Sequence, residues 1–195
     1  MEKKAADIKK IRKAMEKSQD ELRFAHTLGV TYTATSLAMC HGGDIQKAEL
    51  AGMLHDCAKC MDHDKKIALC KKHNISITML EQRNPFLLHA KVGSFIAMNS
   101  YCIHDTDIIN SILNHTTGRP GMSLLEKIIF VADYIEPSRK RAPNLKEIRS
   151  LAFQNLNKAL LWILKDTLHY LEEIGGEIDP MTQKTYNFYM NEEKL

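Results

Sequence analysis

A histidine and an aspartate stand side by side in this chain, His55 followed by Asp56, in the segment ELAGMLHDCAKC. The apolar residues Leu50, Met53 and Leu54 recur before them at helical spacing, so the pair lies on an apolar helix or at its end. Burying an imidazole beside a carboxylate is costly unless a partner such as a metal ion binds both. Neighbours on a helix point about 100° apart. We therefore expect other elements to bring further ligands to the same ion.

Isolated polar residues in other apolar helices could supply those ligands: His26, His89, His115 and Asp133. Asp133 is the most informative of them, because the helix LLEKIIFVADYIEP around it is apolar nearly all round and buried carboxylates are seldom left unpaired. A surface His–Asp pair or a satisfied core histidine would explain any one of these residues alone. Their occurrence on several predicted helices favours one shared site.

Imidazoles and carboxylates together make a nitrogen–oxygen site that suits iron, manganese, zinc or nickel. One ion could be enclosed by His26, His55, Asp56 and Asp133. The second oxygen of Asp56 could bridge to another ion held by His89 and His115. Two such ions suit hydrolysis of phosphate esters and anhydrides, because one lowers the pKa of a water molecule and both stabilise charge in an in-line displacement.

Positive charge near these residues could hold phosphate. Lys59 follows His55 by four residues and Asp56 by three, so on a helix it would share their face. It could also donate a proton or stabilise transition-state charge. The other candidate phosphate contacts are Arg119, in the loop TTGRPG, and Arg139.

A rival metal site would use sulfur ligands. The spacing resembles a small zinc site whose ligands would be Cys57, Cys60, His63, Cys70 and His73. Cys57, however, lies among apolar partners on the predicted helix face, and thiolates there would compete with His55. We therefore prefer the interpretation that these are core cysteines.

The composition is that of an ordinary globular chain, with 195 residues, 44% hydrophobic and 26% charged. We expect one all-α domain over residues 1–195, with a core of about 18–176 and a tail of 177–195. A net charge of +3 and the lack of a basic run argue against nucleic acid binding. No apolar stretch indicates a signal peptide or a membrane span, and five cysteines, an odd number, favour reduced thiols in the cytoplasm.

The helix signals predict where the elements begin and end. We expect a first helix over 2–16, whose apolar residues Ile8, Ile11 and Met15 could face a second subunit. Capping boxes at Ser18 with Glu21 and at Ser123 with Glu126, and caps at Asp44, Asp105 or Thr106, and Asn144, begin later helices. The helix from Asn144 should run to about Ile174. We expect one short helix in 61–85, a helix opened by Pro85, and an irregular segment from 177 onward.

Longer strings in the sequence resemble a known family. His26, the pair His55–Asp56 and Asp133 match the signature of the HD-domain metal-dependent phosphohydrolases. The strings LAGMLHDCAK, HTTGRPGMSLLEKIIFVADYIEPSR and GGEIDPMTQKTYN look like the YqeK-type bacterial HD proteins, which are symmetrical diadenosine tetraphosphate hydrolases. The resemblance covers roughly residues 18–190. One departure is Ser138, where the family commonly has glycine or another small residue.

The resemblance implies an all-α HD bundle, a homodimer, and iron held by His26, His55, Asp56 and Asp133. The nucleotide contacts that it implies are Arg23, His26, Lys59, His89, His115, Thr116, Asp133 and Arg139. Tail residues around 176–182 would close over the nucleotide.

These observations predict an enzyme that cleaves diadenosine tetraphosphate into two ADP, with Asp56, Lys59, His89 and His115 as catalytic residues. One alternative is a phosphohydrolase acting on another nucleotide, such as a dNTP or a cyclic dinucleotide. The other is a non-catalytic module that senses ADP or a related nucleotide. The complete set of ligands favours an enzyme.

Overall fold

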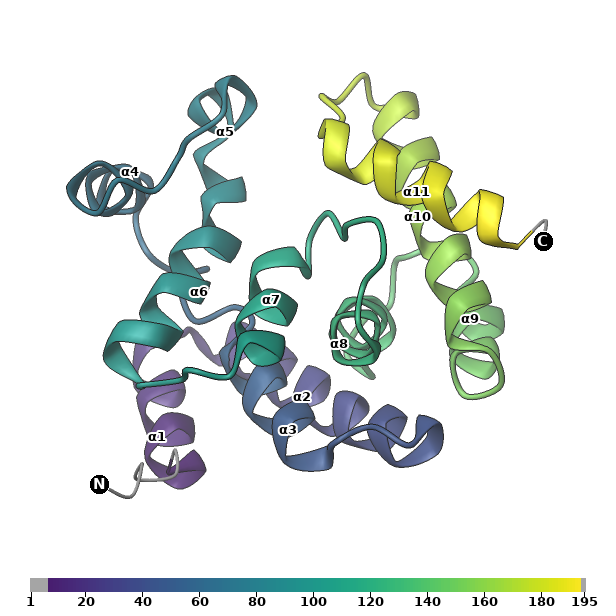
Figure 1. Ribbon diagram of the computed structural model, residues 1–195, viewed down its shortest axis with the longest axis horizontal. Coiled ribbons are helices and arrows are strands. Elements are labelled where there is room, and N and C mark those ends of the chain that lie inside the picture. Colours follow the sequence, from purple (N-terminus) through teal and green to yellow (C-terminus); the bar gives the residue numbers. More distant parts are fainter. Residues whose placement is uncertain (1–6, 194–195) are drawn as a thin grey trace.

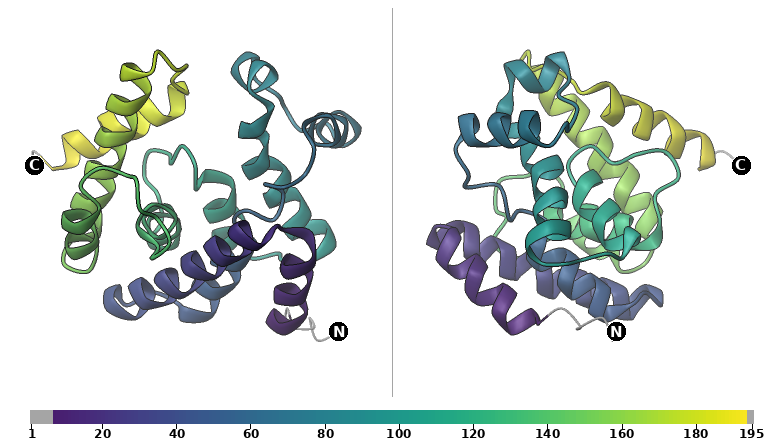
Figure 2. Two further views of the ribbon diagram at one scale, coloured as in Figure 1. Left: turned by 180° about the vertical axis from the view of Figure 1, so that it is seen from behind. Right: turned by 60° about the vertical axis from the view of Figure 1, so that its left-hand side comes forward.

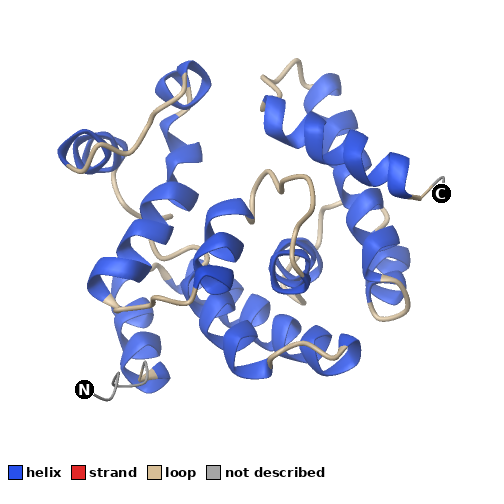
Figure 3. Cartoon of the chain, in the orientation of Figure 1, coloured by secondary structure: helices blue, strands red, loops and turns tan. Residues whose placement is uncertain are grey.

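The computed structural model describes residues 7–193, and within them the chain forms helices and loops without a β-strand (Figure 3). The predicted all-α class is confirmed. The first half contains α1 (Ile8–Ser18), α2 (Glu21–His41), α3 (Ile45–Leu54), α4 (His63–Lys72), α5 (Met79–Arg83), the 3₁₀ turn η1 (Pro85–Leu88) and α6 (His89–Ser100). The second half contains α7 (Thr106–Asn114), α8 (Leu124–Ile135), α9 (Leu145–Ala152), α10 (Leu156–Glu173) and α11 (Pro180–Glu192).

Helix α8 lies at the centre of the molecule, as its apolar sequence predicts. It contacts α2, α3, α7, α9 and α10, with α9 and α10 on one side and α7 on the other (Figure 1). Figure 2 shows the same order from behind. Ile128, Ile129 and Val131 are completely buried there. Burying such a side chain contributes about 1.5–3 kcal/mol, so packing fixes the position of this helix.

Helices α2 and α3 pack closely enough to fix their spacing. A Cβ atom at Gly52 would lie 2.8 Å from the Cα of Thr31, so only glycine permits this approach. The buried small residues Ala34, Ala48 and Ala51 line the same core. The residues that follow α3 are therefore held at a defined distance from those of α2.

Three of the predicted helix starts are confirmed by their caps. Asp44 accepts a hydrogen bond from the backbone N–H of Lys47, and Asp105 caps α7. The capping box of Ser123 and Glu126 is present at the start of α8.

The predicted bounds of the first helix and the predicted cap of the second were partly wrong. Helix α1 ends at Ser18, and its predicted start in residues 1–6 lies outside the described residues. Ser18 does not cap α2, because its hydroxyl donates to the carbonyl of Met15. Asp20 takes that role and accepts from the N–H of Arg23.

The C-terminal predictions were also partly wrong. The long helix is broken at 153–155, where Asn155 accepts from the N–H of Lys158 and starts α10. Asn144 precedes α9 in the left-handed region, without a side-chain cap. The tail is helical, because Asp179 caps α11 and Pro180 occupies its first turn. Residues 61–85 hold α4 and α5 rather than one helix.

Within residues 7–193, no helix combines the length and the apolar character that a bilayer crossing requires.

Candidate active site

His55 and Asp56 lie in tight turns directly after α3 rather than on a helix. The N–H of Cys57 bonds the carbonyl of Leu54 at 3.1 Å, and that of Lys59 bonds the carbonyl of Asp56 at 2.9 Å. Both side chains nevertheless face one centre, because Nε2 of His55 lies 3.6 Å from Oδ2 of Asp56. His55 is 0% and Asp56 2% exposed.

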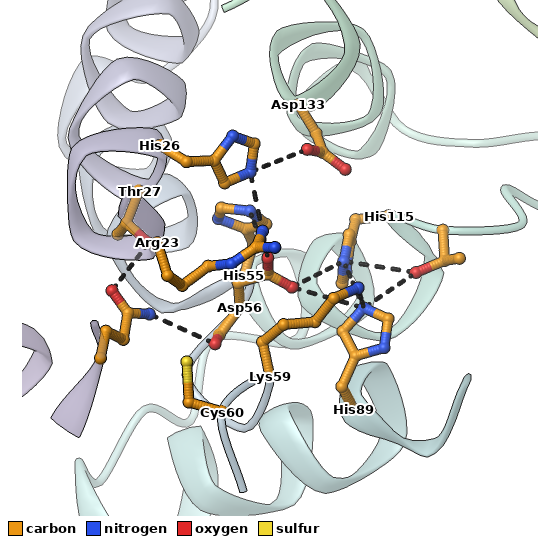
Figure 4. Close-up of polar contacts among 12 residues, drawn as sticks. Arg23, His26, Thr27, His55, Asp56, Lys59, Cys60, His89, His115 and Asp133 are labelled. Carbon is orange, nitrogen blue, oxygen red and sulfur yellow. Dashed lines mark hydrogen bonds and ion pairs between the residues drawn. The ribbon is translucent and has the colours of Figure 1, made fainter. Parts of the chain in front are cut away.

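Asp56 lies at the middle of the site, between two groups of histidines (Figure 4). On one side, its Oδ2 is 3.6 Å from Nε2 of His55 and 3.9 Å from Nε2 of His26. Nε2 of His26 is also 3.1 Å from Oδ1 of Asp133. The predicted set of four residues is thus brought together from α2, the turn after α3, and α8.

On the other side, Oδ1 of Asp56 faces His89 and His115. It lies 3.4 Å from Nε2 of His89 and 3.6 Å from Nε2 of His115. His89 begins α6, and His115 follows the last residue of α7. The two oxygens of Asp56 are therefore divided between the two groups, as the bridging hypothesis requires.

Backbone contacts orient three of the rings. Nδ1 of His55, His89 and His115 each lies 2.7 Å from the carbonyl three residues earlier, to which it donates its proton. Nε2 of each ring then carries a lone pair and faces Asp56. A hydrogen bond from the far nitrogen is the usual way in which a protein fixes a metal-binding imidazole.

Three buried polar atoms have no hydrogen-bond partner within residues 7–193: Nε2 of His26, Nε2 of His55 and Oδ1 of Asp56. Leaving such an atom unsatisfied costs about 1–3 kcal/mol. Two groups have the proximity to hold a metal ion, His26–His55–Asp56 and Asp56–His89–His115. A cation in the first group would satisfy the two imidazole nitrogens, and a cation in the second group would satisfy Oδ1 of Asp56. The residues thus fit the metal that their chemistry suggests.

Comparison with known proteins agrees with this geometry. The family model described as HD domain matches residues 23–138, a range that includes all six of these histidines and aspartates. The chain belongs to the HD domain family.

Three curated or solved relatives are similar over nearly their whole length. The chain is 40% identical to "Bis(5'-nucleosyl)-tetraphosphatase, symmetrical" of Bacillus subtilis, over 88% of this chain and 91% of that one. It is 42% identical to the protein of the same name from Halalkalibacterium halodurans, over 89% and 92%. A crystal structure of a "predicted HD superfamily hydrolase involved in NAD metabolism" from Clostridium acetobutylicum aligns with a TM-score of 0.92, at 39% identity, over 95% and 98%.

Charged and hydroxyl groups surround the ligands of this HD domain. Nη1 of Arg23 is 2.7 Å from Oδ2 of Asp56, and Nη2 of Arg139 is 3.1 Å from Oδ1 of Asp133. Nζ of Lys59 lies 3.2 Å from Nε2 of His89. The structure therefore brings two predicted phosphate contacts, Lys59 and Arg139, and the predicted nucleotide contact Arg23 to the cluster.

Two further predicted contacts, Thr116 and Arg119, lie in the loop TTGRPG after α7 and have different surroundings. The hydroxyl of Thr116 lies 3.3 Å from Nε2 of both His89 and His115. Arg119 instead forms two hydrogen bonds with Glu126, at 2.7 and 2.6 Å. Its guanidinium is occupied in fixing the loop to α8.

Burial and neighbouring charges together set the charge states of the cluster. Burial lowers the pKa of His26, but the nearby carboxylates of Asp133 and Glu136 outweigh it and raise that pKa above its ordinary value. Burial lowers the pKa of His55 to about 4 and that of His89 to about 3, so both rings are neutral at pH 7. Burial opposes ionisation of Asp56 and Asp133 as well, but the neighbouring imidazoles outweigh it, and the pKa of each carboxyl lies below its ordinary value. Neutral imidazoles and ionised carboxylates are the forms that bind metal.

Sequence reasoning missed Glu136. Its side chain is 1% exposed, and Oε1 lies 3.0 Å from Nδ1 of His26. Ser138 donates its hydroxyl to the same oxygen at 2.5 Å and its N–H to the other at 2.6 Å. The signal that singled out Asp133, a carboxylate on an apolar helix, also applied to Glu136 one turn later.

Gln19 was missed as well, and nothing in the sequence distinguished it. Its amide donates to the carbonyl of Asp56 at 3.3 Å and accepts from the hydroxyl of Thr27 at 3.0 Å. It therefore ties the turn after α3 to α2.

The cysteines lie outside the metal-binding groups found among residues 7–193. Cys57 contacts the carbonyl of Gly93, and burial raises the pKa of its thiol to about 12. Cys70 is buried in a separate small apolar cluster with Leu88 and Val92. Cys60 is exposed, beside Asp20. Cys70 is therefore a core cysteine as predicted, and Cys57 is partly buried against the main core, but the prediction is wrong for the exposed Cys60.

Proposed function

We propose that this protein hydrolyses diadenosine tetraphosphate symmetrically, giving two molecules of ADP. The observation that carries the proposal is the division of one buried carboxylate, Asp56, between two groups of histidines. Such an arrangement suits hydrolysis of a phosphate anhydride. The names of the two bacterial relatives at 40% and 42% identity support this substrate.

The metal would be held by the chain's own nitrogen and oxygen ligands. A first ion would bind His26, His55, Asp56 and Asp133, and a second would bind His89 and His115 and share Asp56. We propose iron as the native metal, which the family resemblance supports; manganese, nickel and zinc suit the same ligands. When bound, the metal supplies an activated water and neutralises charge on the phosphates.

The remaining residues hold and orient the substrate. Arg23, Lys59 and Arg139 place positive charge at the cluster, where it would contact phosphate oxygens. The Thr116 hydroxyl adds a neutral donor beside His89 and His115.

The bond that is cleaved follows from the position of these contacts. If Arg139 grips one ADP half and Lys59 contacts the substrate on the other side of Asp56, the second phosphorus lies at Asp56. The oxygen between the second and third phosphates then becomes the leaving atom. Lys59 is placed to stabilise the charge on that oxygen. Both halves of the substrate then leave as ADP.

Chromatography of a quenched reaction tests the proposal directly. We expect ADP as the sole nucleotide product, two for each substrate molecule consumed. Equal amounts of AMP and ATP would mean that the site attacks a neighbouring phosphorus, and would contradict the proposed position of cleavage. Turnover of a dNTP or a cyclic dinucleotide in place of this substrate would favour a different phosphohydrolase, and binding of ADP without turnover would favour a sensor.

We also infer that the protein acts in the cytoplasm as a homodimer, which the family resemblance supports. From the sequence, apolar residues of α1 are expected to face the second subunit. That expectation is wrong for Ile11 and Met15, because both are buried against the chain's own core.

A further inference from the structure

Two hollows approach the cluster from different elements. The first, of about 600 Å³, is bordered by Arg23 and His26 of α2 and by the loop 138–142 after α8. The second, of about 240 Å³, is bordered by Thr116 and by residues of α6, α7 and α11. The first hollow therefore borders His26 itself, and the second borders Thr116, whose hydroxyl lies 3.3 Å from Nε2 of His115.

Asp56 lies between the residues that border the two hollows. His26, which borders the first, lies 3.9 Å from Oδ2 of Asp56. Thr116, which borders the second, touches His115, whose Nε2 is 3.6 Å from Oδ1 of Asp56. In Figure 4, His26 and Arg23 lie on one side of Asp56 and His89 and His115 on the other. A linear polyanion centred at Asp56 would extend one half into each hollow.

The first hollow is bordered by cationic side chains that no carboxylate within residues 7–193 neutralises. It is bordered by four cationic side chains, Arg23, Arg139, Lys140 and Arg141, and by the carboxylates Asp20 and Glu136. Arg23 and Arg139 pair with Asp56 and Asp133. Lys140 and Arg141 are exposed, and no residue among 7–193 forms an ion pair with either. These two cations are available to a bound anion.

The backbone that carries these cations is fixed from outside the hollow. Arg149 of α9 donates to the carbonyls of Ile135 and Glu136 at 2.8 Å each, and to that of Arg139 at 3.0 Å. The loop therefore has a defined start, so less conformational entropy is lost when it binds a ligand.

The second hollow is smaller, and its border is mixed. Its apolar residues are Leu87, Ala90, Leu113 and Met181, and its polar residues are Thr78, Glu81, Lys91, Asn114, Thr116, Thr117 and Asp179. Lys91 pairs with Glu81 at 2.8 Å, which leaves the carboxylate of Asp179 to repel phosphate. This hollow therefore suits a nucleoside better than a chain of phosphates.

We propose that Lys140 and Arg141 bind the phosphates of one nucleoside diphosphate half of the substrate in the first hollow, while the second hollow takes the nucleoside of the other half. The inference rests on the proposed function, because it needs a substrate with two halves. It assigns to Lys140 and Arg141 the recognition of substrate length, since a nucleotide with a single half fills one hollow and leaves the other empty.

The test is the double variant Lys140→Ala/Arg141→Ala. A contact made equally in the ground and transition states changes KM rather than kcat. We expect KM for diadenosine tetraphosphate to rise about tenfold, which is the loss of one or two exposed charge contacts to phosphate, with kcat and metal content unchanged. The matched control, Lys146→Ala/Lys165→Ala, removes two exposed positive charges from α9 and α10 and should leave KM unchanged.

Equilibrium dialysis with ADP gives a readout that is independent of turnover. The wild-type chain should take up two ADP, and the Lys140/Arg141 variant should lose one of them. An unchanged KM with unchanged ADP uptake would overturn the proposal, and so would loss of metal or kcat, because these residues would then be structural. If the wild type releases no ADP from the tetraphosphate, the proposed function fails, but the ADP uptake still decides whether the second subsite exists.

Discussion

Nε2 of His89 and Nε2 of His115 lie 3.1 Å apart, and each ring has already donated its Nδ1 proton to a backbone carbonyl. Two lone pairs facing each other at this distance repel unless positive charge lies beside them. The Lys59 ammonium, 3.2 Å from Nε2 of His89, supplies such charge, and a metal cation between the rings would supply more. Asp56 supplies the negative charge beside both rings. We take this contact as the second half of a two-ion site.

Replacing His89 with alanine tests the second ion. We expect the metal content, measured by elemental analysis of anaerobically purified protein, to fall from two ions per chain to one. The first group does not include His89, so its ion should remain. Replacing His26 instead should remove the first ion. Full metal content with lost turnover in the His89 variant would mean that this pair contacts phosphate and not metal.

Asp56→Asn should have a larger effect than either histidine variant, because both groups share this carboxylate. The amide keeps the shape of the side chain but not its charge. We expect bound transition metal to fall sharply while the helical circular dichroism signal is retained. Metal content equal to that of the wild type would rule out this ligand assignment.

Lys59→Ala and Arg139→Ala should separate phosphate contacts from metal ligands. We expect each variant to keep its metal and to lose about 10²–10³ in rate, the usual cost of removing a preorganised charge. Lys47→Ala is a suitable control, because its partner is the helix cap Asp105 at 2.8 Å. Loss of metal from either test variant would assign that residue a structural role.

Glu136→Gln should weaken metal binding although Glu136 is not a predicted ligand. Its carboxylate accepts from Nδ1 of His26, and loss of such a contact typically lowers metal affinity about 10–100-fold. Gly29→Ala provides an independent route to the same defect, because its Cβ would collide with Oε2 of Glu136. The exposed Glu147→Gln serves as the control. If both test variants bind metal with the dissociation constant of the wild type, Glu136 does not support metal binding by His26.

Light scattering tests the dimer. We expect a mass of twice the 22.3 kDa chain at working concentration. A mass of one chain would contradict the prediction, which depends on the family resemblance.

The sequence by itself determined the all-α class and the residue types of the site. Polar residues isolated on apolar helices are costly to bury, so His26, His55, Asp56 and Asp133 could be recognised without coordinates. The caps at Asp44, Asp105 and Ser123 were also local enough to predict, because a side chain and a backbone N–H three residues away decide them.

Tertiary structure decided what depends on contacts between distant segments. The turns after Leu54, which direct His55 and Asp56 to one centre, follow from packing against α2 and from the bond between Gln19 and Asp56. The tail forms α11 because Tyr189 packs in the core and its hydroxyl accepts from the N–H of Met122. Lys140 and Arg141 border the first hollow because Arg149 of α9 holds the backbone up to Arg139. The tail also carried a local signal that sequence reasoning missed, the cap Asp179 followed by Pro180. The turns and the loop have no such signal, so their positions become defined only when the helices pack.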